Sequence, residues 1–471
     1  MLSKYFGDRG FWRVTLRLAV PIALQNLLTS SYSLVDTLLV GQLGDVVLSA
    51  VGMAGQWSWF LNIVLFGICS GAQLFVSQYW GVRDETGIRR AYGIALLSSM
   101  IVAAVFTVSA AAAPGFVIGL FNDDPAVKAA GCEYISIACW SYPALALSLV
   151  LSTVLRATEN VRLPMAASGF TTVLNAFLDY ALIFGAFGFP EMGVAGAALA
   201  TVISAWCAPV IVLAVAAVKK LVVVTKPREM FGFGASHLRE FFRRAAPVML
   251  NESMWGAGTL TLNLILSNLS YEVYAAVTIT RTFENFAFVF FIGLCNACAI
   301  MVGMSVGAGK ISRAVGDVRR FLTMFPIISL ICGMLMILFR APLVSIFNTE
   351  GNITEATSSA AQLILIIYGA HFAVRNIPYI LIVGTFRPSG DTMTGTKFEM
   401  ICLWLCAIPA TYAAAYLFEL PLAAVIITMY VSEDLPKSIL CLMHYRREKW
   451  IRPVTEEGIA GLERYLEGSS S

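Results

Sequence analysis

Two aspartates and an asparagine stand inside long apolar stretches of the sequence, and their types and spacing suit cation chemistry. A charged side chain at the centre of a lone membrane helix costs about 2.5–3.5 kcal/mol, so Asp36 and Asp179 are expected to be functional or paired. Asn175 precedes Asp179 by four residues, which places both side chains on one helix face. Oxygen ligands bind Na⁺, and a desolvated carboxyl group holds a proton more readily. We predict a cation or proton site, with hydrogen bonding between helices as the alternative, above all for Asn175.

A polar stripe leads up to Asp36. Gln25, Thr29 and Tyr32 precede it at intervals that keep all four side chains on one face of a helix. Because the rest of this segment is apolar, we predict that the stripe lines a substrate cavity.

A second set of charged residues lies in the other half of the chain and is assigned to the same predicted cavity. Glu252 begins a polar face, whereas Arg281 and Glu284 are three residues apart and can pair with each other. Arg375 has no acidic neighbour within its own helix turn, and Glu252 is one possible partner. A structural Glu252–Arg375 ion pair and a transport role are both open. Mutual pairing is the preferred interpretation of a further group, formed by Glu433, Asp434 and Lys437.

These residues are embedded in a composition typical of a membrane protein. Of 471 residues, 58% are hydrophobic and only 13% are charged, against roughly 45–50% and 25% in soluble domains. This balance excludes a soluble enzyme, a disordered chain and a coiled coil, and the net charge of +3 gives no reason to expect a nucleic-acid partner. Segments of about 20 apolar residues predict an all-α integral membrane protein with twelve spans. The predicted spans are 14–40, 47–79, 91–113, 130–155, 163–187, 193–218, 245–269, 273–306, 321–346, 356–386, 398–418 and 421–444.

The basic residues predict an orientation. With twelve spans, 27 of the 32 Lys and Arg residues fall on the side of the two termini and two, Lys128 and Arg340, on the other. The positive-inside rule therefore places both termini in the cytoplasm. The localisation that we expect is a multi-pass protein of the plasma membrane, in particular a bacterial inner membrane.

The two halves of the chain repeat one another. At a constant offset of 226, residues 20–81 match residues 246–307, with Pro21 opposite Pro247 and Cys69 opposite Cys295; residues 156–160 then match residues 387–391. Because each half has six spans, the repeat is parallel and favours a transporter. The predicted division is an N-terminal lobe (1–218), a basic cytoplasmic linker (219–244), a C-terminal lobe (245–445) and a cytoplasmic tail (446–471).

Motifs for enzymatic chemistry or nucleotide binding are missing from the sequence. Gly307-Ala-Gly-Lys310 resembles a P-loop fragment, but Ile311 replaces the required Ser or Thr. Neither the Cys295/Cys298 pair nor the Cys402/Cys406 pair has further ligands nearby to complete a zinc site. We therefore expect a non-enzyme without cofactor, resident metal or ATP, whose transport is passive or driven by an ion gradient.

Several motifs resemble the multidrug and toxic compound extrusion (MATE) family of the MOP flippase superfamily, and the resemblance covers nearly the whole chain. The motifs are 19–22 (AVPI), 33–37 (SLVDT), 40–44 (VGQLG), 71–81 (GAQLFVSQYWG), 155–158 (LRAT), 193–201 (GVAGAALAT) and 387–392 (RPSGDT).

The resemblance implies twelve helices in two lobes around a V-shaped central cavity, and export of cationic, amphiphilic drugs or metabolites in exchange for H⁺ or Na⁺. Asp36 matches the family's first-helix carboxylate, Asn175 and Asp179 match its fifth-helix pair, and Thr201 resembles the hydroxyl that joins them. Coupling is therefore expected in the first lobe, with Na⁺ possible at Asp36, Asn175 and Asp179. Arg375 departs from relatives that carry an acid at that place. A monomer is expected.

Two alternatives remain open at the level of sequence. A flippase for lipid-linked oligosaccharides would want a basic cavity, which Arg281 and Arg375 favour and the acidic first lobe disfavours. A non-transporting receptor or structural membrane protein would give no reason for buried carboxylates within a two-fold repeat.

Overall fold

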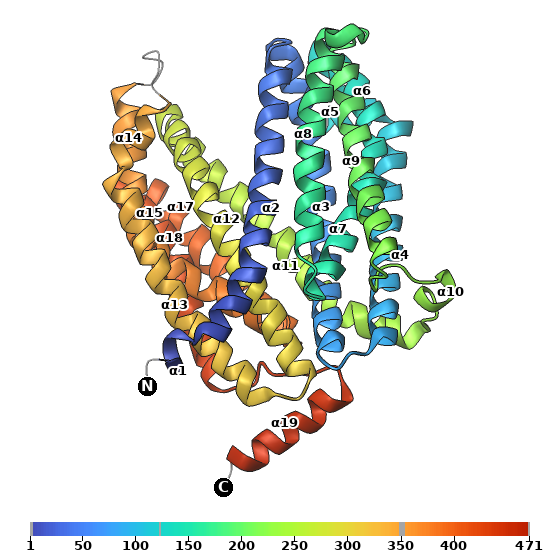
Figure 1. Cartoon of the computed structure of the whole chain (residues 1–471). Coiled ribbons are helices and arrows are strands. Elements are labelled where there is room, and N and C mark those ends of the chain that lie inside the picture. The colour runs from blue at the N-terminus through green and yellow to red at the C-terminus, as the bar shows by residue number, and fades with distance from the viewer. Residues whose placement is uncertain (1–2, 122–123, 348–353, 470–471) are drawn as a thin grey trace. The chain divides into compact units, whose positions relative to one another are not determined.

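The computed structural model describes residues 3–121, 124–347 and 354–469, and almost all of these are helical (Figure 1). Twelve long helical stretches follow one another in the described chain. They are α2 (Arg9–Gly41), α3 (Asp45–Gly81), α4 (Glu85–Ala112), α6 to α7 (Pro125–Ala157), α8 (Arg162–Phe184), α9 (Gly193–Val218), α11 (Ala235–Ser267), α12 (Tyr271–Gly307), α13 (Ile311–Leu338), α15 with η3 (Glu355–Phe386), α16 to η5 (Thr392–Leu417) and α18 (Leu422–Arg446).

Short helices and breaks complete the architecture. The interrupted stretches consist of α6 (Pro125–Ala138), η1 (Cys139–Ser141) and α7 (Tyr142–Ala157); of α15 (Glu355–Leu381) and η3 (Ile382–Phe386); and of α16 (Thr392–Met400), η4 (Ile401–Ala407), α17 (Ile408–Tyr412) and η5 (Ala413–Leu417). The short helices are α1 (Ser3–Phe6), α5 (Pro114–Gly119), η2 (Ala186–Gly188), α10 (Pro227–Met230), α14 (Arg340–Ser345) and α19 (Glu456–Ser469).

The predicted all-α membrane fold with twelve spans is confirmed. Ten of the twelve described stretches are long and apolar enough to cross a bilayer by length and composition. The other two, α11 and α18, are of similar length but less apolar, because α11 begins with a charged segment and α18 carries Glu433, Asp434 and Lys437. Both are matched in the repeat by helices that meet the criterion, α2 and α9.

Side-chain caps define where several of these helices begin. The Asp84 carboxylate accepts a hydrogen bond from the Gly87 N–H at 3.0 Å before α4, and the Ser270 hydroxyl accepts one from the Val273 N–H at 3.2 Å in α12. Such caps satisfy backbone donors that have no partner inside the helix. The short polar connections between the apolar runs therefore fix the helix starts.

The helices form two compact units, and the chain passes between them within helices. The first unit is Pro21–Met249, and the second unit comprises Met1–Val20 and Leu250–Ser471. The beginning of α2 therefore belongs to the second unit and the beginning of α11 to the first, whereas the predicted N-terminal lobe includes residues 1–20 and the predicted C-terminal lobe begins at residue 245. In the second unit the Phe11 ring of α2 lies 5.1 Å from the Phe321 ring, and in the first unit Phe241 of α11 stacks on Phe75 at 5.6 Å.

The internal repeat extends to the backbone of corresponding turns. Arg83 after α3 and Gly309 after α12 both have positive φ, at 60° and 68°, as do Glu159 after α7 and Gly390 after η3, at 64° and 101°. The hydrogen bonds agree as well, since Asp84 N–H donates to Tyr79 O at 3.0 Å and Lys310 N–H donates to Ser305 O at 2.9 Å. The predicted parallel repeat is thus present at the level of individual turns.

Glycines allow close helix contacts inside the first unit. A Cβ at Gly67 or Gly71 of α3 would collide with Met249 or Ala245 of α11, respectively. Small residues at such positions let helix backbones approach closely in membranes. This packing attaches the start of α11 to the first unit.

Candidate functional site

The predicted coupling residues come together in the first unit. Asp36 lies on α2, Asn175 and Asp179 on α8, and Thr201 on α9. Asn175 is 1% exposed and Asp179 is 0% exposed, and the Asp36 and Asp179 carboxyl groups are close enough to interact electrostatically. Helices α2 and α8 therefore bring the two carboxyl groups together inside the first unit, as the sequence predicts.

The polar atoms of this cluster are unusually short of partners. Apart from the contact between the two carboxyl groups, which requires a shared proton, Asp36 Oδ1, both carboxyl oxygens of Asp179 and both amide atoms of Asn175 are buried without a hydrogen-bond partner among the described residues. Nor does any described Lys, Arg or His form an ion pair with either aspartate. Buried polar groups without partners are costly, so an unsatisfied group in a folded protein calls for an explanation such as an ion or a function. This donor set fits a proton or a small hard cation.

Two tyrosines and a serine extend the cluster. Tyr32, predicted from the α2 stripe, interacts with Thr201 and Ser204 of α9 and lies in the field of both aspartates. Tyr134 of α6 is 8% exposed and interacts with Asp36 and Thr201. Sequence reasoning missed Ser204, although it follows Thr201 by about one helix turn, and it missed Tyr134, which no polar neighbours mark in the sequence.

The remaining stripe residues do not join the carboxyl groups. The Gln25 amide donates to the Ser168 hydroxyl at 3.1 Å, which links α2 to α8 within the first unit. The Thr29 hydroxyl is exposed and donates to the Gln25 carbonyl of its own helix at 3.0 Å. Of the four residues of the predicted stripe, Gln25 therefore contacts another helix, Thr29 is exposed, and Tyr32 and Asp36 belong to the carboxyl cluster.

The possible Glu252–Arg375 ion pair is wrong. Glu252 pairs with Arg387, whose Nη2 lies 2.7 Å from Glu252 Oε1, and Arg387 is only 4% exposed. Arg387 is one of the 27 basic residues that the positive-inside rule assigns to the cytoplasmic side, but it stands directly after η3 and its side chain is buried within the second unit. Arg387 also lies in the field of Glu399, which accepts a hydrogen bond from the Asn251 amide at 2.9 Å.

Arg375 belongs to a separate polar network of the second unit, together with Glu284 and Asp434. Its guanidinium lies 5.5 Å from the centre of the Tyr368 ring and interacts electrostatically with both acids. Glu284 also accepts a hydrogen bond from the Tyr430 hydroxyl at 2.9 Å and lies in the field of Arg281. Every acid of this group thus has a basic residue nearby.

The expected group in α18 does pair mutually and adds a histidine that sequence reasoning missed. Lys437 Nζ lies 2.7 Å from Glu433 and 3.3 Å from Asp434, and His371 Nε2 lies 3.1 Å from the other Asp434 oxygen. His371 stands one turn before Arg375, and this spacing could have revealed it.

The two units therefore differ in charge. In the second unit, Glu252, Glu284 and Asp434 each have a guanidinium or ammonium group nearby, whereas Asp36 and Asp179 of the first unit lie close to each other without a basic partner among the described residues.

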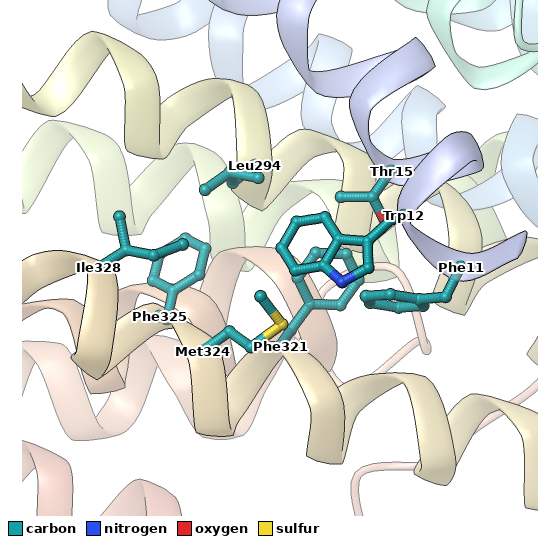
Figure 2. Close-up of a pocket in the computed structure, with 8 residues that line it drawn as sticks. All are labelled: Phe11, Trp12, Thr15, Leu294, Phe321, Met324, Phe325 and Ile328. Carbon is teal, nitrogen blue, oxygen red and sulfur yellow. The ribbon is translucent and has the colours of Figure 1, made fainter. Parts of the chain in front are cut away.

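A small apolar pocket in the second unit does not coincide with the predicted site residues. Phe11, Trp12 and Thr15 of α2 line it together with side chains of α12 and α13 (Figure 2). Thr15, its only polar residue, donates its hydroxyl to the Met301 sulfur at 3.6 Å. The pocket offers no acid, base or metal ligand. All ten cysteines are free, and the described residues contain no cluster of three or more His, Cys, Asp or Glu side chains suited to a metal.

Fold and site together define a helical membrane transporter built from two repeats. The MatE family model matches residues 21–181 and 247–413, one match in each half. The chain belongs to the MatE family, whose members are transporters and not enzymes.

Relatives and solved structures agree with this assignment. The chain is 26% identical over 447 residues to the probable multidrug resistance protein NorM of Thermotoga maritima, covering 92% of each protein. It is 24% identical over 417 residues to the probable multidrug resistance protein YoeA of Bacillus subtilis, covering 88% of this chain and 89% of that protein. A mutant of the Vibrio cholerae MATE transporter VcmN superposes with a TM-score of 0.85 at 19% identity, over 95% of this chain and 98% of that one. A MOP superfamily transporter from Pyrococcus furiosus superposes with a TM-score of 0.83 at 18% identity, over 95% and 97%.

Proposed function

We propose that the protein is a secondary antiporter that exports cationic, amphiphilic drugs or metabolites in exchange for H⁺ or Na⁺, and that Asp36, Asn175, Asp179 and Thr201 couple the two fluxes. The observation that carries this proposal is the pair of carboxyl groups on α2 and α8, which are close to each other and have no basic partner among the described residues. The names of the relatives support the substrate class.

Competition for one negative charge provides the exchange mechanism. With both carboxyl groups ionised, the first unit attracts an organic cation. A proton or Na⁺ that arrives from outside neutralises one of these two negative charges, and the affinity for the organic cation falls. A ligand shifts a conformational equilibrium only through its different affinities for the two states, and this competition supplies such a difference.

We propose further that the protein is a monomeric, multi-pass protein of the plasma membrane with both termini in the cytoplasm, and that it needs no cofactor or ATP. The distribution of basic residues supports the orientation. An inward flux of H⁺ or Na⁺ then drives the organic cation outward.

The second unit contributes structure more than coupling in this proposal. Arg387 is held by Glu252, Arg375 lies in the field of Glu284 and Asp434, and Arg281 also lies near Glu284, so acids of the unit offset the charge of each guanidinium. A flippase for lipid-linked oligosaccharides would need such cationic groups to bind pyrophosphate. The charge pairing therefore favours the drug antiporter over the flippase.

The experiment is efflux of a fluorescent organic cation from proteoliposomes under separate H⁺ and Na⁺ gradients. We expect one of the two gradients to drive efflux by the wild type, and Asp36→Asn to abolish the driven component while the protein still inserts and folds. Unimpaired gradient-driven efflux by Asp36→Asn would disprove coupling at this cluster, and its absence from the wild type under both gradients would disprove antiport.

A further inference from the structure

A side-chain link joins two turns at one end of the first unit. Trp80, at the end of α3, donates its indole N–H to Glu159 in the turn after α7 at 3.1 Å. The Arg83 guanidinium covers the Trp80 ring at 3.9 Å from the centroid. Three side chains thus connect the α3–α4 turn with the α7–α8 turn.

The second unit repeats both turns but lacks these side chains. By the repeat alignment, Val306 stands for Trp80, Gly309 for Arg83 and Gly390 for Glu159. The backbone of the turns is conserved, as their matching hydrogen bonds and positive φ values show. Valine and glycine cannot form the link, so the same two turns need another connection.

The segment after the last long helix reaches the first of these turns. Thr455 donates its hydroxyl to the Gly307 carbonyl at 2.6 Å. Gly461 of α19 lies so close to Gly309 that a Cβ at either position would collide with the backbone of the other segment. Helix α19 is therefore docked on the α12–α13 turn through a glycine-to-glycine contact that no larger residue permits.

The same segment also reaches the second turn. Arg452 N–H donates to the Ser389 carbonyl at 2.9 Å, and Ile451 forms an antiparallel bridge with Gly390. The Arg452 guanidinium lies 3.2 Å from Asp391. One short stretch of chain thus holds the α15–α16 turn by backbone and by charge.

Buried anchors fix this stretch. Trp450 is 0% exposed, stacks on Tyr445 at 6.1 Å and donates its indole N–H to the Tyr445 carbonyl at 3.2 Å. His444 Nε2 lies 2.7 Å from Asp391, the residue that Arg452 also contacts. An unstructured tail would show none of these contacts.

We propose that residues 447–469 form an internal strap of the second unit, which replaces the Trp80–Glu159 link of the first. The strap holds the α12–α13 and α15–α16 turns together. It also fixes the turn that begins with Arg387, and so it positions the guanidinium that pairs with Glu252. The tail is thus a part of the transporter's framework.

The first unit provides a parallel. Helix α10 follows α9 as the strap follows α18, and it packs on α4, the repeat counterpart of α13. There Arg89 pairs with Glu229 at 2.6 Å, and a Cβ at Gly93 would collide with the Met230 carbonyl. In both halves the segment after the sixth long helix therefore returns to the third helix of its own unit.

The experiment measures hydrogen exchange of the full-length protein in lipid nanodiscs, so it requires no transported ion or drug and does not depend on the proposed function. Gly461→Leu is designed to displace α19. Gly468→Leu is the matched control in the same helix, because a Cβ there meets nothing within 4 Å. Thr455→Val, a nearly isosteric change, removes the hydroxyl that donates to the Gly307 carbonyl at 2.6 Å and accepts from the Gly458 N–H at 3.1 Å, so it weakens the same contact of α19 from the other side.

We expect Gly461→Leu and Thr455→Val to accelerate amide exchange at residues 305–312 and 387–391 by about fivefold or more, because the first disrupts the Gly309 contact and the second removes the Thr455 hydrogen bonds. Residues 156–160 of the first unit and the Gly468→Leu protein should exchange as in the wild type. Gly461→Leu protein that exchanges fast along α19 but is unchanged at residues 387–391 would overturn the strap.

Discussion

Arg387 and Glu252 form an ion pair of 2.7 Å in the second unit, and the arginine is almost completely buried. Its repeat counterpart is Arg156, whose Nε donates to the Ser152 carbonyl at 3.2 Å, within its own helix. The two halves thus use one arginine position differently. In the second half it neutralises Glu252 of α11, an acid whose repeat counterpart in the first half is Asn26.

Removing Arg387 alone should destabilise the protein strongly. Breaking a buried pair by losing one partner costs about 3–5 kcal/mol, because the other charge stays buried, whereas replacing both partners is often close to neutral. We expect Arg387→Met to lower the unfolding temperature in detergent far more than the double change Arg387→Met with Glu252→Met. Additive effects of the single changes would show that the pair is not coupled.

Tyr134 should tune the affinity for the coupling ion. Its hydroxyl hydrogen-bonds to Thr201 and lies in the field of Asp36, and a hydrogen bond between neutral groups contributes about 0.5–1.5 kcal/mol. We expect Tyr134→Phe to change the ion concentration for half-maximal efflux by about tenfold, since tenfold corresponds to about 1.4 kcal/mol. The control is Tyr142→Phe, which removes a neighbouring tyrosine hydroxyl that contacts Ser58 at 3.2 Å and, among the described residues, interacts with neither Asp36 nor Thr201. Equal behaviour of the two variants would contradict a role of Tyr134 in the site.

Much of the fold could be predicted because its signals are local. Apolar length gave the spans, and the repeat predicted which turns correspond. The closeness of Asp36 and Asp179 rested on helix periodicity together with the family resemblance. Apolar length and helix periodicity describe single helices, and the repeat and the family resemblance describe equivalent positions.

Partner choice in three dimensions could not be predicted in the same way. Residues 387–391 (RPSGD) have the composition of an exposed turn, and only the path of η3 and α16 shows that Arg387 is buried against Glu252. The exchange of the first turns of α2 and α11 between units changes no hydropathy value. The strap depends on the contact of Gly461 with Gly309 and of Thr455 with Gly307, and since each pair is about 150 residues apart, no periodicity connects its members.

Asp391 should make the stability of the second unit sensitive to acid. Burial raises the pKa of this carboxyl group, but the His444 hydrogen bond, the Thr394 hydroxyl and the Arg452 charge outweigh it and lower the pKa below its usual value of 3.8. A group whose pKa is lowered by folding stabilises the folded state above its unfolded pKa, and this contribution is lost as the pH falls through the folded pKa.

We therefore expect wild type to be more stable than Asp391→Asn at pH 7, and this difference to shrink only below about pH 4. The measurement is thermal unfolding in detergent as a function of pH. Asp124→Asn is a suitable control, because Asp124 caps α6 of the first unit and lies outside the strap. A stability difference that already disappears near neutral pH would contradict a lowered pKa at Asp391.

Arg375 should support the second unit without carrying the ion dependence of transport. Its guanidinium balances Glu284 and Asp434 within the membrane-spanning helices, so Arg375→Met leaves these acids with less positive charge and should cost about 3–5 kcal/mol of stability. The fraction that folds should still respond to the coupling gradient, because Asp36 and Asp179 are unchanged. Efflux per folded molecule, measured beside Asp36→Asn, tests this separation.

The control for Arg375→Met is Arg281→Met, which removes another cation near Glu284 and so identifies any general effect of lost positive charge. A stable Arg375→Met protein that no longer responds to either gradient would move the coupling site into the second unit.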